Sequence, residues 1–185
     1  MNSFTRRGLI AGAGASVLLA GACGNGIGSR GGETIDARVD ATRDFLFARY
    51  PGTRELADKS YGVLYIPLVT EAGLGIGGGY GRGALRINDI SVDYYSATRA
   101  TFGLQIGAQQ YAHALFFMTE PALADFRRSD GWGVGADARY ALPDQGASIG
   151  KETAEIAPVI AMVFGQSGLI AGATLAGIKY TRIIP

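Results

Sequence analysis

Two residue types that often carry out acid–base or metal chemistry occur once each in this chain of 185 residues, as His113 and Cys23. One histidine and one cysteine do not supply a typical zinc site, and the carboxylates show no ligand spacing. A Ser-His-Asp triad would have to use His113, which lies in YAHALFFM, a stretch typical of ordinary sheet packing. We therefore expect no metal, no cofactor and no enzymatic activity, with His113 satisfied inside a strand.

Glycine recurs at every second position in GLGIGGGYGRG, residues 73–83. Gly73, Gly75 and Gly78 have the G-x-G-x-x-G spacing of a dinucleotide loop, but the following YGRGALRIND does not begin the helix that this loop requires. No Gly-Lys-Ser or Gly-Lys-Thr ends the stretch, as a phosphate-binding loop would need. A flexible linker would seldom alternate glycine with Leu, Ile and Tyr. Period two instead predicts a β-strand with one bare face.

The glycine face of this strand consists of Gly73, Gly75, Gly77, Gly79 and Gly81. We expect Gly75, Gly77 and Gly79 to lie under another element or at a strong bend, because side chains there would block close approach. If this face were flat and open to solvent, its glycines would instead become candidates for a lipid or partner contact.

The N-terminus has the features of an export signal. MNSFTRRGLIAGAGASVLLAGAC begins with charge, continues with an apolar run of about 15 residues and ends in small residues before Cys23. This run is shorter than the roughly 20 residues that cross a bilayer as a helix, which favours cleavage over a retained anchor. Residues 5–10, TRRGLI, resemble a twin-arginine export signal.

Cys23 stands where a bacterial lipoprotein carries its lipid. Ala20-Gly21-Ala22-Cys23 resembles a relaxed lipobox, although Ala20 replaces the usual leucine and Ala20-x-Ala22 equally fits a plain cleavage site. We favour lipidation of Cys23 over a soluble periplasmic protein. The expected organisation is a signal peptide at 1–22, a flexible tether at 23–33 and one domain at 34–185.

The charge balance excludes some partners. Loss of residues 1–22 removes Arg6 and Arg7, which leaves 15 Lys and Arg against 16 Asp and Glu, a net charge of −1. This gives no electrostatic basis for binding nucleic acid, and it argues against a strongly polybasic membrane surface.

Periodicity predicts helices at the start of the domain and strands after it. Ile35, Val39, Leu46 and Tyr50 share a helical face that Pro51-Gly52 ends, and a second helix follows at 53–60 with Thr53 as a candidate N-cap. Strands are expected at 62–68, 73–81, 83–88, 91–98, 102–108, 111–118, 133–142, 159–165, 169–175 and 177–184.

Turn residues join these expected strands closely. Asn88-Asp89 predicts a tight hairpin turn and residues 166–168 another, while Thr119-Glu120-Pro121 begins one inserted helix that ends near Asp130-Gly131. The predicted fold class is therefore α+β, mostly β: an antiparallel β sandwich or barrel-like sheet with N-terminal helices and one inserted helix.

Three long blocks resemble the SYLF domain family, which includes eukaryotic lipid- and actin-binding proteins and many bacterial lipoproteins. The blocks are YGVLYIPLVTEAGLGIGGGYGRGALRI, DYYSATRATFGLQIGAQQYAHALFFMTEPALADFRRSDGWGVGADARYAL and APVIAMVFGQSGLIAGATLAGIKYTRI. They occur in the family's order and cover roughly residues 34–184. The resemblance implies a non-enzymatic, membrane-associated binding module.

The resemblance also implies a lipid contact through basic residues near the domain's N-terminus. Here that segment offers Arg38, Arg43 and Arg49, but interspersed acids cancel its basic character, which argues against phosphoinositide-type recognition. Arg127-Arg128, at the end of the inserted helix, could bind a phosphate or lipid headgroup, or complement the helix C-terminal dipole. Actin is not an expected partner of an exported bacterial protein.

We therefore expect a lipoprotein that binds lipid on the periplasmic side of the cell envelope, at the outer membrane. Gly24 after the lipidated cysteine favours that membrane, because aspartate there would favour inner-membrane retention in some bacteria. The alternative is a structural or assembly factor that holds an envelope protein through a sheet edge or apolar patch. A hydrolase that depends on His113 ranks third.

Overall fold

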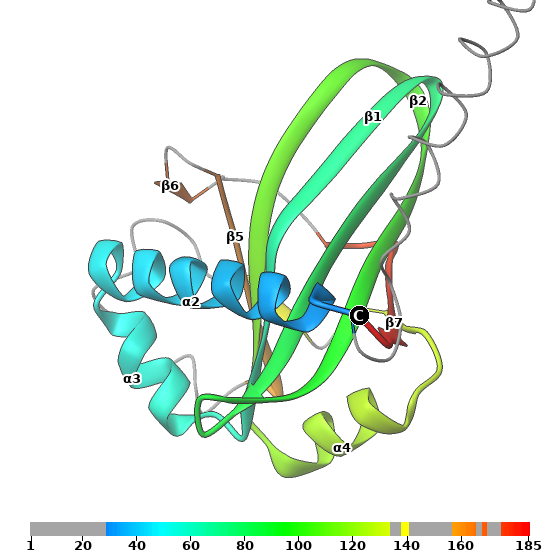
Figure 1. The fold of residues 1–185 in the computed structure, drawn as a ribbon. Coiled ribbons are helices and arrows are strands. Elements are labelled where there is room, and N and C mark those ends of the chain that lie inside the picture. Colours follow the sequence, from blue (N-terminus) through cyan, green and yellow to red (C-terminus); the bar gives the residue numbers. More distant parts are fainter. Residues whose placement is uncertain (1–28, 134–137, 141–156, 166–167, 170–174) are drawn as a thin grey trace, which may run out of the picture.

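The computed structural model describes residues 29–133, 138–140, 157–165, 168–169 and 175–185, which form a curled sheet with three helices (Figure 1). The helices are α2 (Gly31–Arg49), α3 (Gly52–Lys59) and α4 (Glu120–Arg128). The strands are β1 (Gly62–Ile87), β2 (Ile90–Phe117), β3 (Trp132–Gly133), β4 (Ala138–Tyr140), β5 (Val159–Gly165), β6 (Gly168–Leu169) and β7 (Ile178–Ile183). The α+β, mostly β class with a barrel-like sheet is confirmed.

The first helix packs through the face that the sequence predicted. Ile35, Val39 and Leu46 of α2 are buried, and the helix ends at Arg49, just before Pro51. Its first residue, Gly31, lies within the stretch expected to be a tether. Ser29 Oγ donates a hydrogen bond of 2.8 Å to the carbonyl oxygen of Pro185, so the start of the described chain lies beside its C-terminus.

The second helix begins differently from the prediction. Thr53 is not the N-cap of α3, because the helix starts at Gly52 with Pro51 in the cap position. The Thr53 side chain is fully buried, and its Oγ1 donates a hydrogen bond of 2.7 Å back to the Tyr50 carbonyl oxygen. By contrast, the predicted start of α4 is confirmed, since Thr119 Oγ1 accepts a hydrogen bond from the Ala122 N–H.

Two long strands dominate the sheet, where the sequence predicted six shorter ones. β1 and β2 pair in antiparallel register from Gly62 opposite Phe117 to Ile87 opposite Ile90. The predicted turn joins them, with φ of 50° at Asn88 and 62° at Asp89. The predicted interruptions do not occur, because three register shifts and several glycines bend the strands without breaking the hydrogen-bonded ladder.

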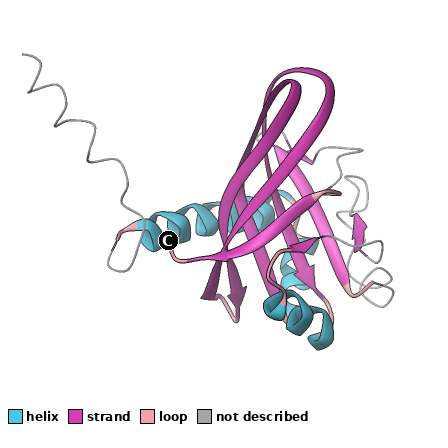
Figure 2. Cartoon of the chain, turned by 90° about the vertical axis from the view of Figure 1, so that its right-hand side faces the viewer, coloured by secondary structure: helices cyan, strands magenta, loops and turns pink. Residues whose placement is uncertain are grey.

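The β1–β2 ribbon folds over at its end, so that its two halves face each other (Figures 1 and 2). The early part of β2, residues 94–99, pairs with β7, whereas the late part, residues 112–117, pairs with β5. The sheet therefore curls into a half-barrel. Its pairs among the described residues are antiparallel, with the exception of β4 and β5, which are parallel.

Some predicted strands are described only in part. The predicted strand at 159–165 is confirmed as β5, and β7 matches most of 177–184. The predicted strand at 133–142 overlaps the end of β3 and the whole of β4, while its residues 134–137 and 141–142 lie outside the described residues. Of the predicted strand at 169–175 and the turn at 166–168, residues 166–167 and 170–174 likewise lie outside them.

Alternating side chains give the curled sheet an apolar layer on each face. One core cluster fills the inside of the curl, where α4 adds Leu123 and Phe126 to residues such as Leu115 and Tyr180. The other lies outside, where α2 and α3 cover residues such as Phe116. Neither these helices nor α4 is long and apolar enough to cross a membrane.

Candidate functional site

The glycine-rich half of β1 lies against the first half of the same strand. A Cβ on Gly81 would lie 2.6 Å from the carbonyl oxygen of Leu68, and one on Gly83 would overlap the carbonyl oxygen of Tyr65. Real Cβ atoms essentially never come within 3.0 Å of such neighbours. Glycine at these positions is therefore what allows the half-barrel to close on itself.

The ribbon reverses direction between Gly73 and Gly77. A Cβ on Gly73 would lie 2.6 Å from Gly77 Cα, although four residues of extended strand would span roughly 13 Å. The pairing register shifts at the same place, between Leu74 and Gly75. Gly75 and Gly77 thus lie at a strong bend, as predicted, and the glycine face is not flat.

A buried polar cluster joins the two halves of the ribbon just below this bend. Glu71 is only 6% exposed, and it accepts hydrogen bonds from Tyr111 Oη at 2.6 Å, Gln109 Nε2 at 2.8 Å and Arg99 Nη1 at 3.4 Å. Its side chain lies over Gly79, where a Cβ would come within 2.7 Å of Glu71 Cγ. Gly79 is therefore closely covered, but by a side chain of its own strand and not by another element as predicted.

Electrostatics favour the charged form of this buried carboxylate. Burial alone would raise the pKa of Glu71, but the hydrogen bonds from Tyr111 and Gln109 and the charge of Arg99 outweigh it and lower the pKa. Burial and the bond to Glu71 raise the pKa of Tyr111, which stays a neutral donor. We call Glu71, Arg99, Gln109 and Tyr111 the Glu71 cluster. Sequence reasoning missed it, and a lone acid in a strand gave no signal for it.

Beyond this cluster, the ribbon presents apolar side chains to solvent. Ile76 is 73% exposed and Tyr80 is 53% exposed. We define the ribbon tip as residues 72–81 of β1 and 100–108 of β2. Residues 72–78 pair with 100–108 around the bend, whereas residues 79–81 pair with Arg99, Thr98 and Ala97 at the base of the tip. Neither stretch contains a charged residue. The tip extends away from the helices (Figures 1 and 2).

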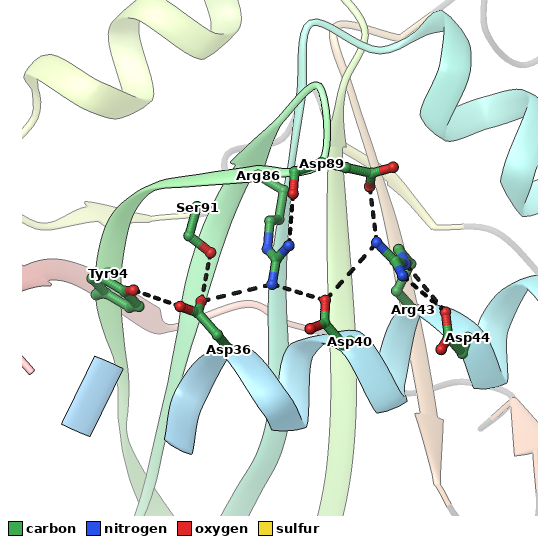
Figure 3. Close-up of polar contacts among 8 residues, drawn as sticks. All are labelled: Asp36, Asp40, Arg43, Asp44, Arg86, Asp89, Ser91 and Tyr94. Carbon is green, nitrogen blue, oxygen red and sulfur yellow. Dashed lines mark hydrogen bonds and ion pairs between the residues drawn. The ribbon is translucent and has the colours of Figure 1, made fainter. Parts of the chain in front are cut away.

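The arginines predicted to contact lipid are largely held by acids within the protein. Arg43 of α2 reaches Asp44 at 3.1 Å, Asp89 of the hairpin turn at 3.2 Å and Asp40 at 3.9 Å (Figure 3). Burial would lower the pKa of Arg43, but Asp44 and Asp89 outweigh it and raise the pKa. Its guanidinium therefore fastens α2 to the β1–β2 hairpin.

A second arginine, which the sequence did not single out, extends this contact. Arg86 of β1 reaches Asp40 at 2.9 Å and Asp36 at 3.7 Å, both on α2 (Figure 3). Asp36 also accepts hydrogen bonds from Ser91 Oγ at 2.6 Å and Tyr94 Oη at 2.8 Å. We call these ion pairs and hydrogen bonds the helix–hairpin network. The one sequence signal for this network was that Asp36 and Asp40 are four residues apart and therefore lie on the same face of α2.

Arg127 and Arg128, the last two residues of α4, also contact acids of the same chain. Arg127 Nε donates to Asp93 Oδ2 at 3.0 Å, and Arg182 reaches the same oxygen at 3.4 Å. Arg128 pairs with Asp125 at 2.6 Å and also donates to the Ala124 carbonyl, in the last turns of the helix. Arg128 therefore interacts with the C-terminal end of its own helix, which is the second of the two roles considered for it from the sequence.

The structure does not gather the five arginines into one patch. Arg38 and Arg49 are exposed on α2, and the Arg49 guanidinium lies 5.9 Å from the Tyr50 ring centre. α2 packs on the outer cluster of the sheet, whereas α4 packs on the inner one. The two groups thus lie on elements that cover opposite faces.

The lone histidine is placed in the interior. His113 is fully buried; its Nε2 lies 2.8 Å from Tyr180 Oη, and Nδ1 is unpaired among the described residues. Burial lowers the pKa of His113 to about 3. Within the described ranges, no three His, Cys, Asp or Glu residues are grouped to hold a metal. Cys23 lies outside those ranges. Residues 146–150 also lie outside them; their sequence, GASIG, has the Gly-x-Ser-x-Gly spacing of a hydrolase nucleophile turn.

Together, these features define a half-barrel domain with a glycine-lined, apolar ribbon tip and largely neutralised surface arginines. Residues 98–182 match the family model Ysc84, described as Las17-binding protein actin regulator. Residues 98–182 therefore match the SYLF domain family, as the resemblance predicted. The match covers most of β2, α4 and the strands after it, while β1 and the N-terminal helices lie before it. No curated protein matches the chain.

Proposed function

We propose that this protein is an exported lipoprotein whose SYLF domain binds lipid without catalysing a reaction. The observation that carries the proposal is the family match over residues 98–182, because SYLF domains are lipid- or actin-binding modules. Of these two ligands, the predicted export signal and Cys23 favour lipid over actin. In this proposal the domain lies on the periplasmic side of the envelope, attached to the outer membrane, where we expect neither actin nor nucleic acid as a partner.

The state of the arginines supports a lipid contact that depends little on charge. Arg43, Arg127 and Arg128 each pair with a carboxylate of the same chain. A headgroup phosphate would have to displace that carboxylate to gain the same guanidinium. Apolar surface is therefore the main source of affinity in this proposal.

A non-catalytic role agrees with the burial of His113. A general base must reach a substrate proton and hold a pKa near the working pH. His113 is instead enclosed by the sheet with a pKa of about 3. Activity lost in a His113→Ala variant that remained folded would support a hydrolase instead.

Vesicle flotation tests the lipid contact. The chain from Cys23 onward, carrying Cys23→Ala, retains every described residue but lacks the lipid anchor. We expect it to float with vesicles of phosphatidylethanolamine and phosphatidylglycerol, and also with neutral phosphatidylcholine vesicles. Absence of flotation with any of these, and with envelope lipid extract, would exclude lipid binding by the folded domain.

The alternative is that the same apolar surface holds an envelope protein. Exposed Ile76 and Tyr80 favour this alternative as a second candidate, because apolar patches also mark protein interfaces. Crosslinking in the intact envelope distinguishes the two. One dominant protein adduct, without flotation, would replace the lipid proposal.

A further inference from the structure

The ribbon tip has a graded polarity along its length that suits one kind of partner. On the outward face of β1, Ile76, Gly78, Tyr80 and Arg82 follow one another at every second position. The register places Phe102, Ala100, Thr98 and Ser96 of β2 opposite them, in the same order. From the bend outward along β1, the paired residues are therefore first apolar, Ile76 with Phe102. They are then Tyr80 with Thr98, and finally Arg82 with Ser96.

A lipid bilayer presents the same sequence of environments from inside to outside. Hydrocarbon accepts Ile and Phe, the interfacial zone is enriched in Tyr, and the headgroup layer accommodates Arg. A folded protein partner would not require polarity to change in this direction along a projecting ribbon.

We propose that the ribbon tip inserts Ile76 into the interfacial region of a lipid bilayer, with Tyr80 among the headgroups. The inference rests on the proposed lipid-binding function and assigns its surface, at a place different from the arginines of α2. The absence of charge from residues 72–81 and 100–108 allows this entry, since a charged side chain there would oppose it.

The backbone limits how deep the tip can go. β1 and β2 pair with each other at the tip, and each has a second edge whose N–H and C=O groups have no strand partner there among the described pairs. Unpaired backbone groups are costly in hydrocarbon, so insertion is restricted to the depth at which water and headgroups reach these edges. Such shallow contact gives modest affinity, and the lipid on Cys23 would supply the second membrane attachment.

Site-specific labelling tests the assignment. The Cys23→Ala background has no other cysteine, so Ile76→Cys places a single environment-sensitive fluorophore at the tip. The matched control is Ile90→Cys, since Ile90 is a 67% exposed isoleucine at the opposite, hairpin end of the same ribbon. On addition of phosphatidylethanolamine–phosphatidylglycerol vesicles, we expect a blue shift and brightening at position 76 only.

Measurements of the vesicle partition coefficient test how much Ile76 contributes to the free energy of binding. We expect Ile76→Asp to lower the vesicle partition coefficient by about tenfold or more, because it removes an apolar side chain and adds a charge. Ile90→Asp should leave it unchanged. Circular dichroism and unfolding midpoints of both variants should match the parent, since both positions are exposed.

Each alternative result overturns the proposal in a recognisable way. If the parent floats but neither variant loses affinity and label 76 stays solvent-like, the tip is not the contact, and lipid binding itself stands. Equal shifts at 76 and 90 would mean adsorption of the whole ribbon. If the parent binds no vesicle, both proposals fail. A photo-crosslinker at position 76 that captures one protein in the envelope would identify the tip as a protein interface.

Discussion

The two ends of the β1–β2 ribbon differ in their charge: ion pairs hold the hairpin end, whereas the folded end is uncharged. At the hairpin end, Arg43 and Arg86 join α2 to the strands through aspartates, and the ends of the network are fixed by Ser91 and Tyr94. At the folded end, uncharged residues and glycines form the bend, and apolar side chains face solvent. The difference suggests that charge holds the fold together where helix meets sheet, and that its absence leaves the tip available for contact.

The Glu71 cluster marks the boundary between these regions. It is polar like the helix–hairpin network, but it is buried between two halves of one ribbon rather than between a helix and a turn. Because Gly79 makes room for the Glu71 side chain, the glycine pattern and the buried acid form one structural unit. The tip's orientation relative to the half-barrel therefore depends on both.

The largest expected effect comes from adding one methyl group at Gly83, where the two halves of β1 lie against each other. Gly83→Ala should destabilise the protein by about 3 kcal/mol or more, because the new Cβ would overlap the Tyr65 carbonyl oxygen. Gly78→Ala is the matched control, since its Cβ would point outward and approach nothing closer than 3.4 Å. Denaturant unfolding measures both. Equal stability of the two variants would show that the halves of β1 do not close as described.

The hairpin end should respond to loss of its central arginine. Arg86→Ala is expected to cost about 2 kcal/mol of unfolding free energy, because Asp36 and Asp40 lose their shared partner at a half-buried position. Arg38→Ala, an exposed arginine on α2, should change stability by less than about 0.5 kcal/mol. A similar loss in both variants would mean that the network does not fasten the helix.

The Glu71 cluster should contribute less, and in a pH-dependent way. Glu71→Gln is expected to cost about 1–2 kcal/mol at neutral pH, since Tyr111 and Arg99 lose a charged acceptor. Folding lowers the pKa of Glu71, so its contribution is fully present above the unfolded pKa of 4.5 and disappears as pH falls through the folded pKa.

Paired unfolding curves check this sign. The stability difference between parent and Glu71→Gln should be constant near neutral pH and shrink below about pH 4. Glu55→Gln, at an exposed acid of α3, serves as the control and should show little difference throughout. A difference that grew on acidification would mean that Glu71 is neutral in the folded protein.

Local sequence patterns predicted the elements of this fold better than their connections. The buried positions of α2, the cap of α4 and the turn at Asn88-Asp89 follow from side-chain spacing and backbone preference, which are properties of neighbouring residues. The folding of one strand against itself depends on contacts such as Gly83 with Tyr65, eighteen positions apart. The alternation of glycine showed that something must pack closely there, but nothing local identified the partner.

The same distinction applies to the candidate site. Sequence reasoning found the glycine face and the opposing charges near α2, yet Arg86, Ser91 and Tyr94 enter the network only because the hairpin lies beside the helix. Ile76 and Tyr80 belonged to an expected strand, where burial is the usual outcome for apolar residues. Their exposure follows from the bend, which points this face away from the core.

The smallest effect should come from salt, and it separates the two ends of the ribbon most directly. Raising NaCl to about 0.5 M should reduce unfolding free energy by less than about 1 kcal/mol, because partly exposed pairs such as Arg43–Asp89 are screened. Arg43→Gln should show a weaker salt response than the parent. Vesicle binding through Ile76 and Tyr80 should be unchanged by the same salt, since apolar contact is not screened. Flotation that collapses in salt would instead assign the membrane contact to arginines such as Arg38 and Arg49.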